Sequence, residues 1–181
     1  MLLLEKFLSR RFKIKTSNIG SYCFLKFPHY IIGHKYIKFK SFTSQPGLRI
    51  ECIDTYYNQK FYPRLNIGKG VSFNYRCHIG VINEVIIGDD VLIGSNVLIT
   101  DHSHGTNSIE DIDEAPETRK LYSSGRVVIE EKVWIGENVC VLPNVTIGCN
   151  SIIGANSVVT HDIPPYSVAV GCPARVIRTI K

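Results

Sequence analysis

The sequence predicts an all-β fold in which short strands stack as the coils of a parallel β-helix. The first observation is an aliphatic residue that recurs every six residues and is often followed by glycine. The second is another aliphatic position with the same period, two residues earlier. A period of six fits neither a helical stripe nor simple strand alternation. The first set includes Ile67, Ile79, Ile87, Ile93, Ile99, Ile129, Ile135, Ile147 and Ile153, and the second Val85, Val91, Val97, Val127, Val133, Val139 and Val145.

These hexads group in threes, and each group predicts one triangular coil whose aliphatic side chains point into a narrow core. The regular coils cover residues 65–82, 85–102, 127–144 and 145–162, and a less regular one covers 31–64. We expect the glycines at turns where a side chain would crowd or where φ is positive. The predicted β-helix domain spans 31–181, with an excursion loop at 101–126 and a tail at 163–181.

The first 30 residues form a separate segment, which we predict to be helical. Its start, Met1 to Lys15, is too short and too charged to span a membrane, and it lacks the pattern of a signal peptide. The preferred interpretation is a terminal helix that packs on its own protein. The alternative is a basic amphipathic helix at a membrane surface.

Composition and charge argue against several functional classes of protein. The chain has 181 residues and a formal net charge of +5 that is spread along it, which is too weak an excess to indicate nucleic acid binding. It could still attract an anionic co-substrate. The six cysteines show no CxxC or zinc-ribbon spacing, which favours free thiols in a reducing, cytoplasmic setting and no metal site.

The repeat stops after Ile99 and resumes at Val127, and the polar segment between them carries two histidines, His102 and His104. A long excursion from a rigid scaffold is often functional. Histidine suits the general base that a hydroxyl acceptor needs in acyl transfer. The candidates to orient its ring by accepting the other N–H are Asp101, Glu110, Asp111 and Asp113, and the sequence does not choose among them.

With these features the chain resembles the hexapeptide-repeat O-acetyltransferases that act on galactosides, maltose and surface polysaccharides. The resemblance covers about 65–181 and rests on the hexads, the histidine-bearing loop, V-W-I-G at 133–136 and the tail D-I-P-P-Y-S-V-A-V-G-C-P-A-R at 162–175. It implies a left-handed helix, a homotrimer with sites between subunits, and direct transfer from acetyl-CoA to a sugar hydroxyl of a surface polysaccharide. Counting from Ile99 makes His104 the base, with His102 a close second.

The resemblance also implies roles for other residues. Asn74 and Trp134 would line the acceptor and thioester site, and Asn83 lies near the place of an acidic acceptor-binding residue in the galactoside enzymes. A backbone N–H near Trp134 and Gly136 would hold the oxyanion. The residues implied at the coenzyme A channel are Gly136, Ala155, Thr160, His161, Arg175 and Arg178, with His161 standing where the family often has lysine.

Three alternatives stay open at this point. A γ-type carbonic anhydrase would use His78, His102 and His104 as zinc ligands. A non-catalytic β-helix would serve only as a scaffold or trimerisation unit. An N-acetyltransferase that acts on an amino-sugar would use the same base and the same donors.

Overall fold

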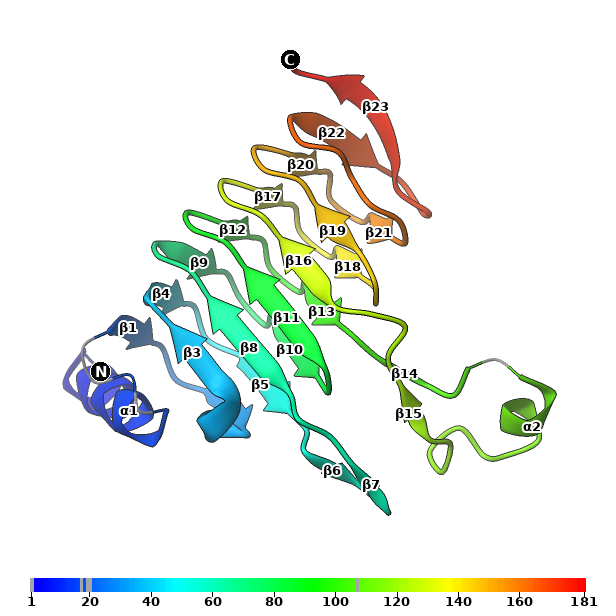
Figure 1. Ribbon diagram of the computed structural model, residues 1–181. Helices are drawn as coiled ribbons and strands as arrows, with labels where there is room; N and C mark the ends of the chain where they lie inside the picture. Colours follow the sequence, from blue (N-terminus) through cyan, green and yellow to red (C-terminus); the bar gives the residue numbers. More distant parts are fainter. Residues whose placement is uncertain (1, 17, 19–20, 107) are drawn as a thin grey trace.

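The computed structural model describes residues 2–16, 18, 21–106 and 108–181. The protein is mostly β, with three parallel sheets that the chain visits in turn (Figure 1). Sheet A holds β1 (Tyr22–Leu25), β4 (Ser41–Ser44), β9 (Val71–Phe73), β12 (Leu92–Ile93), β17 (Trp134–Ile135), β20 (Ile152–Ile153), β22 (Ser167–Val170) and β23 (Arg175–Thr179). Only its last pair, β22 with β23, is antiparallel.

Sheet B holds β2 (His29–Ile32), β5 (Leu48–Cys52), β10 (His78–Val81), β13 (Leu98–Thr100), β18 (Cys140–Val141) and β21 (Val158–Val159). Sheet C holds β3 (Ile37–Phe39), β8 (Arg64–Ile67), β11 (Glu84–Ile87), β16 (Val127–Ile129) and β19 (Thr146–Ile147). Successive strands alternate among the sheets, and each strand pairs with the strand one coil away. This order is consistent with a parallel β-helix.

The predicted aliphatic positions form the core. They align in columns along each sheet, and sheet A places Phe73, Ile93, Ile135 and Ile153 in one column. All four side chains are at most 2% exposed. Burial of such a side chain stabilises the fold by about 1.5–3 kcal/mol. The hexad therefore sets which side chains face inward.

The hexad glycines are explained by crowding and not by positive φ, although the sequence allowed both reasons. A Cβ on Gly94 would lie 2.7 Å from the carbonyl carbon of Gly136, and one on Gly88 would lie 2.6 Å from the nitrogen of Glu131. Crowding by the next coil thus explains these glycines. Positive φ falls two residues later, at residues such as Asp90 (57°) and Asn96 (58°). Asparagine and aspartate tolerate this conformation because their short polar side chains bond locally.

The parallel sheets begin earlier than residue 31, the predicted start of the β-helix. Helix α1 spans Leu2–Lys15, and β1 and β2 already belong to sheets A and B. Phe12 of α1 is 3% exposed and stacks on Phe39, with the ring centroids 5.5 Å apart. Aromatic side chains fill this end of the core in place of the hexad aliphatics, which is why the repeat is weak there.

Two excursions leave the sheets on the same side of the protein (Figure 1). The hairpin of β6 (Thr55–Tyr56) and β7 (Gln59–Lys60) is the shorter one. The longer one, between β13 and β16, contains β14 (Ser103–His104), α2 (Ile109–Ile112) and β15 (Leu121–Tyr122). Gln59 joins them, because its side chain accepts from the Leu121 N–H at 2.8 Å and donates to the Leu121 carbonyl at 3.1 Å. A short 3-10 helix, η1 (His34–Tyr36), follows β2.

Candidate active site

His102 stands at the point where the chain leaves sheet B, and a buried carboxylate holds its ring. Asp101 is fully buried, and its Oδ1 lies 3.0 Å from Nδ1 of His102. The same carboxylate accepts the backbone N–H groups of Ile82 at 2.9 Å and Asn83 at 2.8 Å. Three donors thus converge on Asp101. Because a carboxylate only accepts hydrogen bonds, Nδ1 of His102 carries a proton, and in the neutral ring Nε2 presents its lone pair.

The surroundings of His102 leave room for a ligand. Its side chain is 12% exposed and lines a hollow of about 430 Å³ together with Thr160, Tyr122, Leu142 and Pro143. Thr160 follows β21 on the next coil but one, and its Oγ1 lies 2.8 Å from Nδ1 of His161. The structure therefore brings His102 and the predicted coenzyme residue Thr160 to one hollow, with His161 adjacent to it in sequence.

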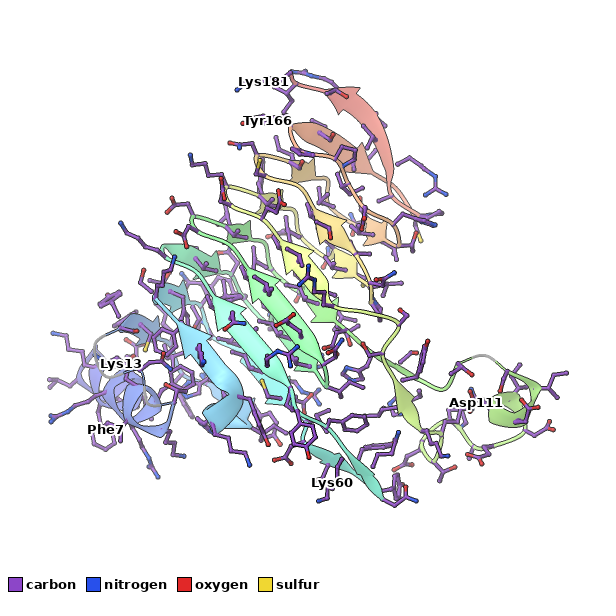
Figure 2. All side chains as sticks on the ribbon, viewed as in Figure 1. Phe7, Lys13, Lys60, Asp111, Tyr166 and Lys181 are labelled. Atoms are coloured by element: carbon purple, nitrogen blue, oxygen red, sulfur yellow. The ribbon has the colours of Figure 1, made fainter. Side chains whose placement is uncertain are left out.

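His104 has a different environment. It lies exposed in β14, and its Nδ1 is 3.4 Å from the hydroxyl oxygen of Tyr56. The Tyr56 hydroxyl also donates to the Glu117 carbonyl. No carboxylate partner of His104 is found among the described residues. Glu110, Asp111 and Asp113, the other acids considered, lie at or beside α2, and Figure 2 shows Asp111 at the far end of the excursion.

Most of the remaining predicted residues lie on sheet A or at its turns rather than beside His102. Trp134 is 51% exposed on β17, and the side chains of β23 are exposed. The predicted residues in this group are Asn74, Trp134, Gly136, Ala155, Arg175 and Arg178. Within one chain, the candidate base follows a strand of sheet B, whereas this group lies on or beside sheet A.

The expected oxyanion donors near Trp134 are already engaged. The N–H of Trp134 donates to the Ser151 carbonyl at 2.9 Å, and the N–H of Gly136 donates to the Ile153 carbonyl at 2.8 Å. Both bonds join one coil to the next. The ladder of the parallel sheet thus uses these two N–H groups, and an oxyanion donor elsewhere near Trp134 stays a prediction.

His78, the third histidine considered as a zinc ligand, belongs to another cluster. Its Nε2 lies 2.9 Å from Oε2 of Glu51, which also accepts from Arg49 at 2.8 Å. Burial lowers the pKa of His78, against the effect of Glu51. His78, His102 and His104 thus have separate partners, and no group of three metal-ligating side chains occurs within the described ranges. Arg49 and Glu51 could not be predicted from the sequence, because their residue types and spacing form no motif.

Comparison with known proteins indicates which class of protein has this fold and site. The family model described as bacterial transferase hexapeptide (six repeats) matches residues 126–161. The model described as hexapeptide repeat of succinyl-transferase matches residues 84–107. The fold and these matches define the protein as a hexapeptide-repeat protein. Comparison with functionally curated proteins gave no significant match.

Solved structures identify the activity class. A maltose O-acetyltransferase from Clostridium difficile 630 is 28% identical, with a TM-score of 0.65 over 99% of this chain and 88% of that one. A galactoside acetyltransferase in complex with coenzyme A is also 28% identical, with a TM-score of 0.54 over 99% and 80%. The N-acyltransferase AntD from Bacillus cereus shares the fold, with a TM-score of 0.71 at 17% identity over 94% and 89%. The chain is an acyltransferase that carries hexapeptide repeats and is similar to these acetyltransferases.

Proposed function

We propose that the protein transfers an acetyl group from acetyl-CoA to a hydroxyl of a saccharide acceptor, with His102 as the general base. The observation that carries this proposal is the Asp101–His102 pair beside the hollow that Thr160 also lines. His102 has the buried carboxylate partner that a catalytic imidazole needs, whereas His104 does not have one among the described residues. This geometry favours His102 over His104, whereas the spacing from Ile99 favoured His104.

The proposed chemistry is a direct transfer. Nε2 of His102 takes the proton of the acceptor hydroxyl as its oxygen attacks the thioester carbonyl. The carbon–sulfur bond breaks, the new ester forms, and the imidazolium returns the proton to the departing thiolate. Asp101 stabilises the imidazolium and keeps Nδ1 protonated throughout, since Ile82 and Asn83 fix its carboxylate.

The test is release of free thiol from acetyl-CoA by the purified protein, with a panel of neutral sugars, uronic acids, amino-sugars and oligosaccharides. Release that depends on a hydroxyl acceptor supports O-acetyl transfer. Release only with amino-sugars would replace the proposal by N-acetyl transfer, and no release with any acceptor would overturn it. A surface-polysaccharide acceptor is part of the proposal, and its support is the resemblance of the D-H-S-H loop at 101–104 to enzymes of that group.

We further propose a left-handed coil and a homotrimer in which sheet A of one copy meets the His102 hollow of its neighbour. The support is the division of the predicted residues: His102 and Thr160 follow strands of sheet B, whereas Trp134, Arg175 and Arg178 lie on sheet A. A closed ring of three copies would bring the two groups together at each interface. The proposed cytoplasmic location rests on the cysteine pattern alone.

Mixing two inactive variants tests the shared site. We expect His102→Ala and Arg178→Ala proteins to be weak alone and to recover activity when they are unfolded and refolded together. With random assembly, about a quarter of the interfaces would carry both wild-type groups. Thiol release is the measurement, and refolding each variant alone is the control. If the mixture gained no activity over the separate variants, the site would lie within one chain.

Helix α1 supports a contact with an anionic membrane surface. Leu3, Phe7 and Ile14 are 83%, 60% and 58% exposed, and Figure 2 shows Phe7 pointing away from the sheets. Lys6, Arg10, Arg11, Lys13 and Lys15 occupy the same helix. No helix among the described residues is long and apolar enough to cross a membrane. Apolar side chains beside basic ones are typical of helices that lie in the interface.

Vesicle co-sedimentation tests this contact. We expect the protein to pellet with vesicles that contain phosphatidylserine, and Phe7→Ser to reduce the bound fraction several-fold because it removes an exposed apolar anchor. Tyr62→Ser is the control, since Tyr62 is 79% exposed but lies far from α1 in the sequence. Equal binding by wild type and Phe7→Ser would contradict the proposal.

A further inference from the structure

The outer face of sheet B changes from polar to apolar along the coil stack. One outward column carries, in register, Tyr30, Arg49, His78, Leu98, Cys140 and Val158. Its first members come from the coils near α1 and can form hydrogen bonds. Its last members come from the coils on the C-terminal side and are apolar or weakly polar. His102 lies where the two halves meet, because it comes two residues after the end of β13.

The polar half contains a compact cluster centred on Glu51. Its carboxylate is 15% exposed and accepts both Nη2 of Arg49 at 2.8 Å and Nε2 of His78 at 2.9 Å. These bonds lower the pKa of Glu51, although burial opposes them. The carboxylate and the guanidinium compensate each other, and burial lowers the pKa of His78. The cluster is thus close to neutral while it offers both N–H donors and a carboxylate acceptor.

Gly80 links this cluster to the candidate base. In the parallel register, Gly80 lies opposite Glu51 on the neighbouring strand, about 4.8 Å away. A Cβ on Gly80 would lie 3.1 Å from Cε1 of His102, so the imidazole lies directly over this glycine. A positive charge on His102 also lowers the pKa of His78. The cluster and the base therefore share one surface, one strand apart.

We propose that Arg49, Glu51 and His78 form the acceptor subsite and bind a neutral saccharide through two of its hydroxyl groups. A hydroxyl both donates and accepts, and a compensated Arg–Glu pair supplies both partners. An anionic acceptor would instead need an uncompensated cation. Tyr30 is 55% exposed next to Arg49 and offers an aromatic face to the apolar side of a sugar ring. The apolar half of the sheet face is left for the acyl-thioester arm. This inference rests on the proposed acyl transfer.

The first test measures binding without turnover. Saturation-transfer NMR with neutral methyl glycosides and with the matching uronic acids reports contact with the protein directly. We expect a neutral glycoside to bind wild type and His102→Ala alike, and to bind Glu51→Gln and Arg49→Met about tenfold more weakly or worse, since each loses a charge-assisted hydrogen bond. Tighter binding of the uronic acids, or unchanged binding by both variants, would overturn the subsite.

The second test separates recognition from folding and from catalysis. Glu84→Gln is the matched control, because Glu84 is also 15% exposed and pairs with Arg64 at 2.9 Å, but on sheet C. In thiol-release assays we expect Glu51→Gln to raise the acceptor KM about tenfold while the KM for acetyl-CoA stays within twofold, and Glu84→Gln to change neither. Absence of thiol release by wild type would overturn the proposed function, whereas failure of every neutral glycoside to bind would overturn only the subsite.

Discussion

Replacing His102 by alanine should lower kcat by roughly 10²–10⁴-fold, because the imidazole is the proposed general base and such catalysis contributes about that factor. The KM for acetyl-CoA should change little, since the lost group acts on the acceptor proton. Thiol release under saturating acetyl-CoA is the measurement.

His104→Ala is the matched control, since the two histidines lie in one tetrapeptide and differ in their partners. His104 is exposed and contacts Tyr56, so its loss should leave kcat within a fewfold of wild type. Asp101→Asn should resemble His102→Ala, because an amide can donate to Nδ1 and thereby favour the wrong tautomer. If His104→Ala were inactive and His102→Ala active, His104 would be the general base, as its spacing from Ile99 predicted.

The choice between these histidines depends on contacts that the sequence does not reveal. The count from Ile99 predicted His104 from the spacing in related enzymes, but the partner of His102 depends on contacts between coils. Asp101 obtains two of its donors from Ile82 and Asn83, one coil earlier in the chain. A six-residue period says which side chains face inward. It does not say which polar groups of neighbouring coils come into contact at the surface.

The same limit applies to the cluster around Glu51. Its two partners have different sequence separations, since Arg49 is two residues away and His78 is 27 residues away. Register across β5 and β10 brings them together, and register was predictable only where the hexads were regular. In the first coils, aromatic residues such as Phe39 and Phe42 replace the aliphatics, so the repeat there gave only weak positions.

The regular coils allow a sharp prediction about stability. Ile152 and Ile153 are the two residues of β20, and Ile153 points into the core at 0% exposure whereas Ile152 lies on the outer surface beside Trp134. Ile153→Ala should lower the free energy of unfolding by about 2–5 kcal/mol, because it removes buried methyl groups and leaves a cavity between Ile135 and Ala169. Urea unfolding at a fixed protein concentration is the measurement.

Ile152→Ala removes the same atoms from the same strand and is therefore the control. Its side chain is only partly buried, so we expect a loss below about 1 kcal/mol. The difference between the two variants isolates the inward position from β propensity and side-chain size, since both changes replace isoleucine in neighbouring positions. Losses of equal size would mean that the outer surface of sheet A is as buried as the core. That result would itself point to a partner subunit covering β20, in keeping with the proposed interface.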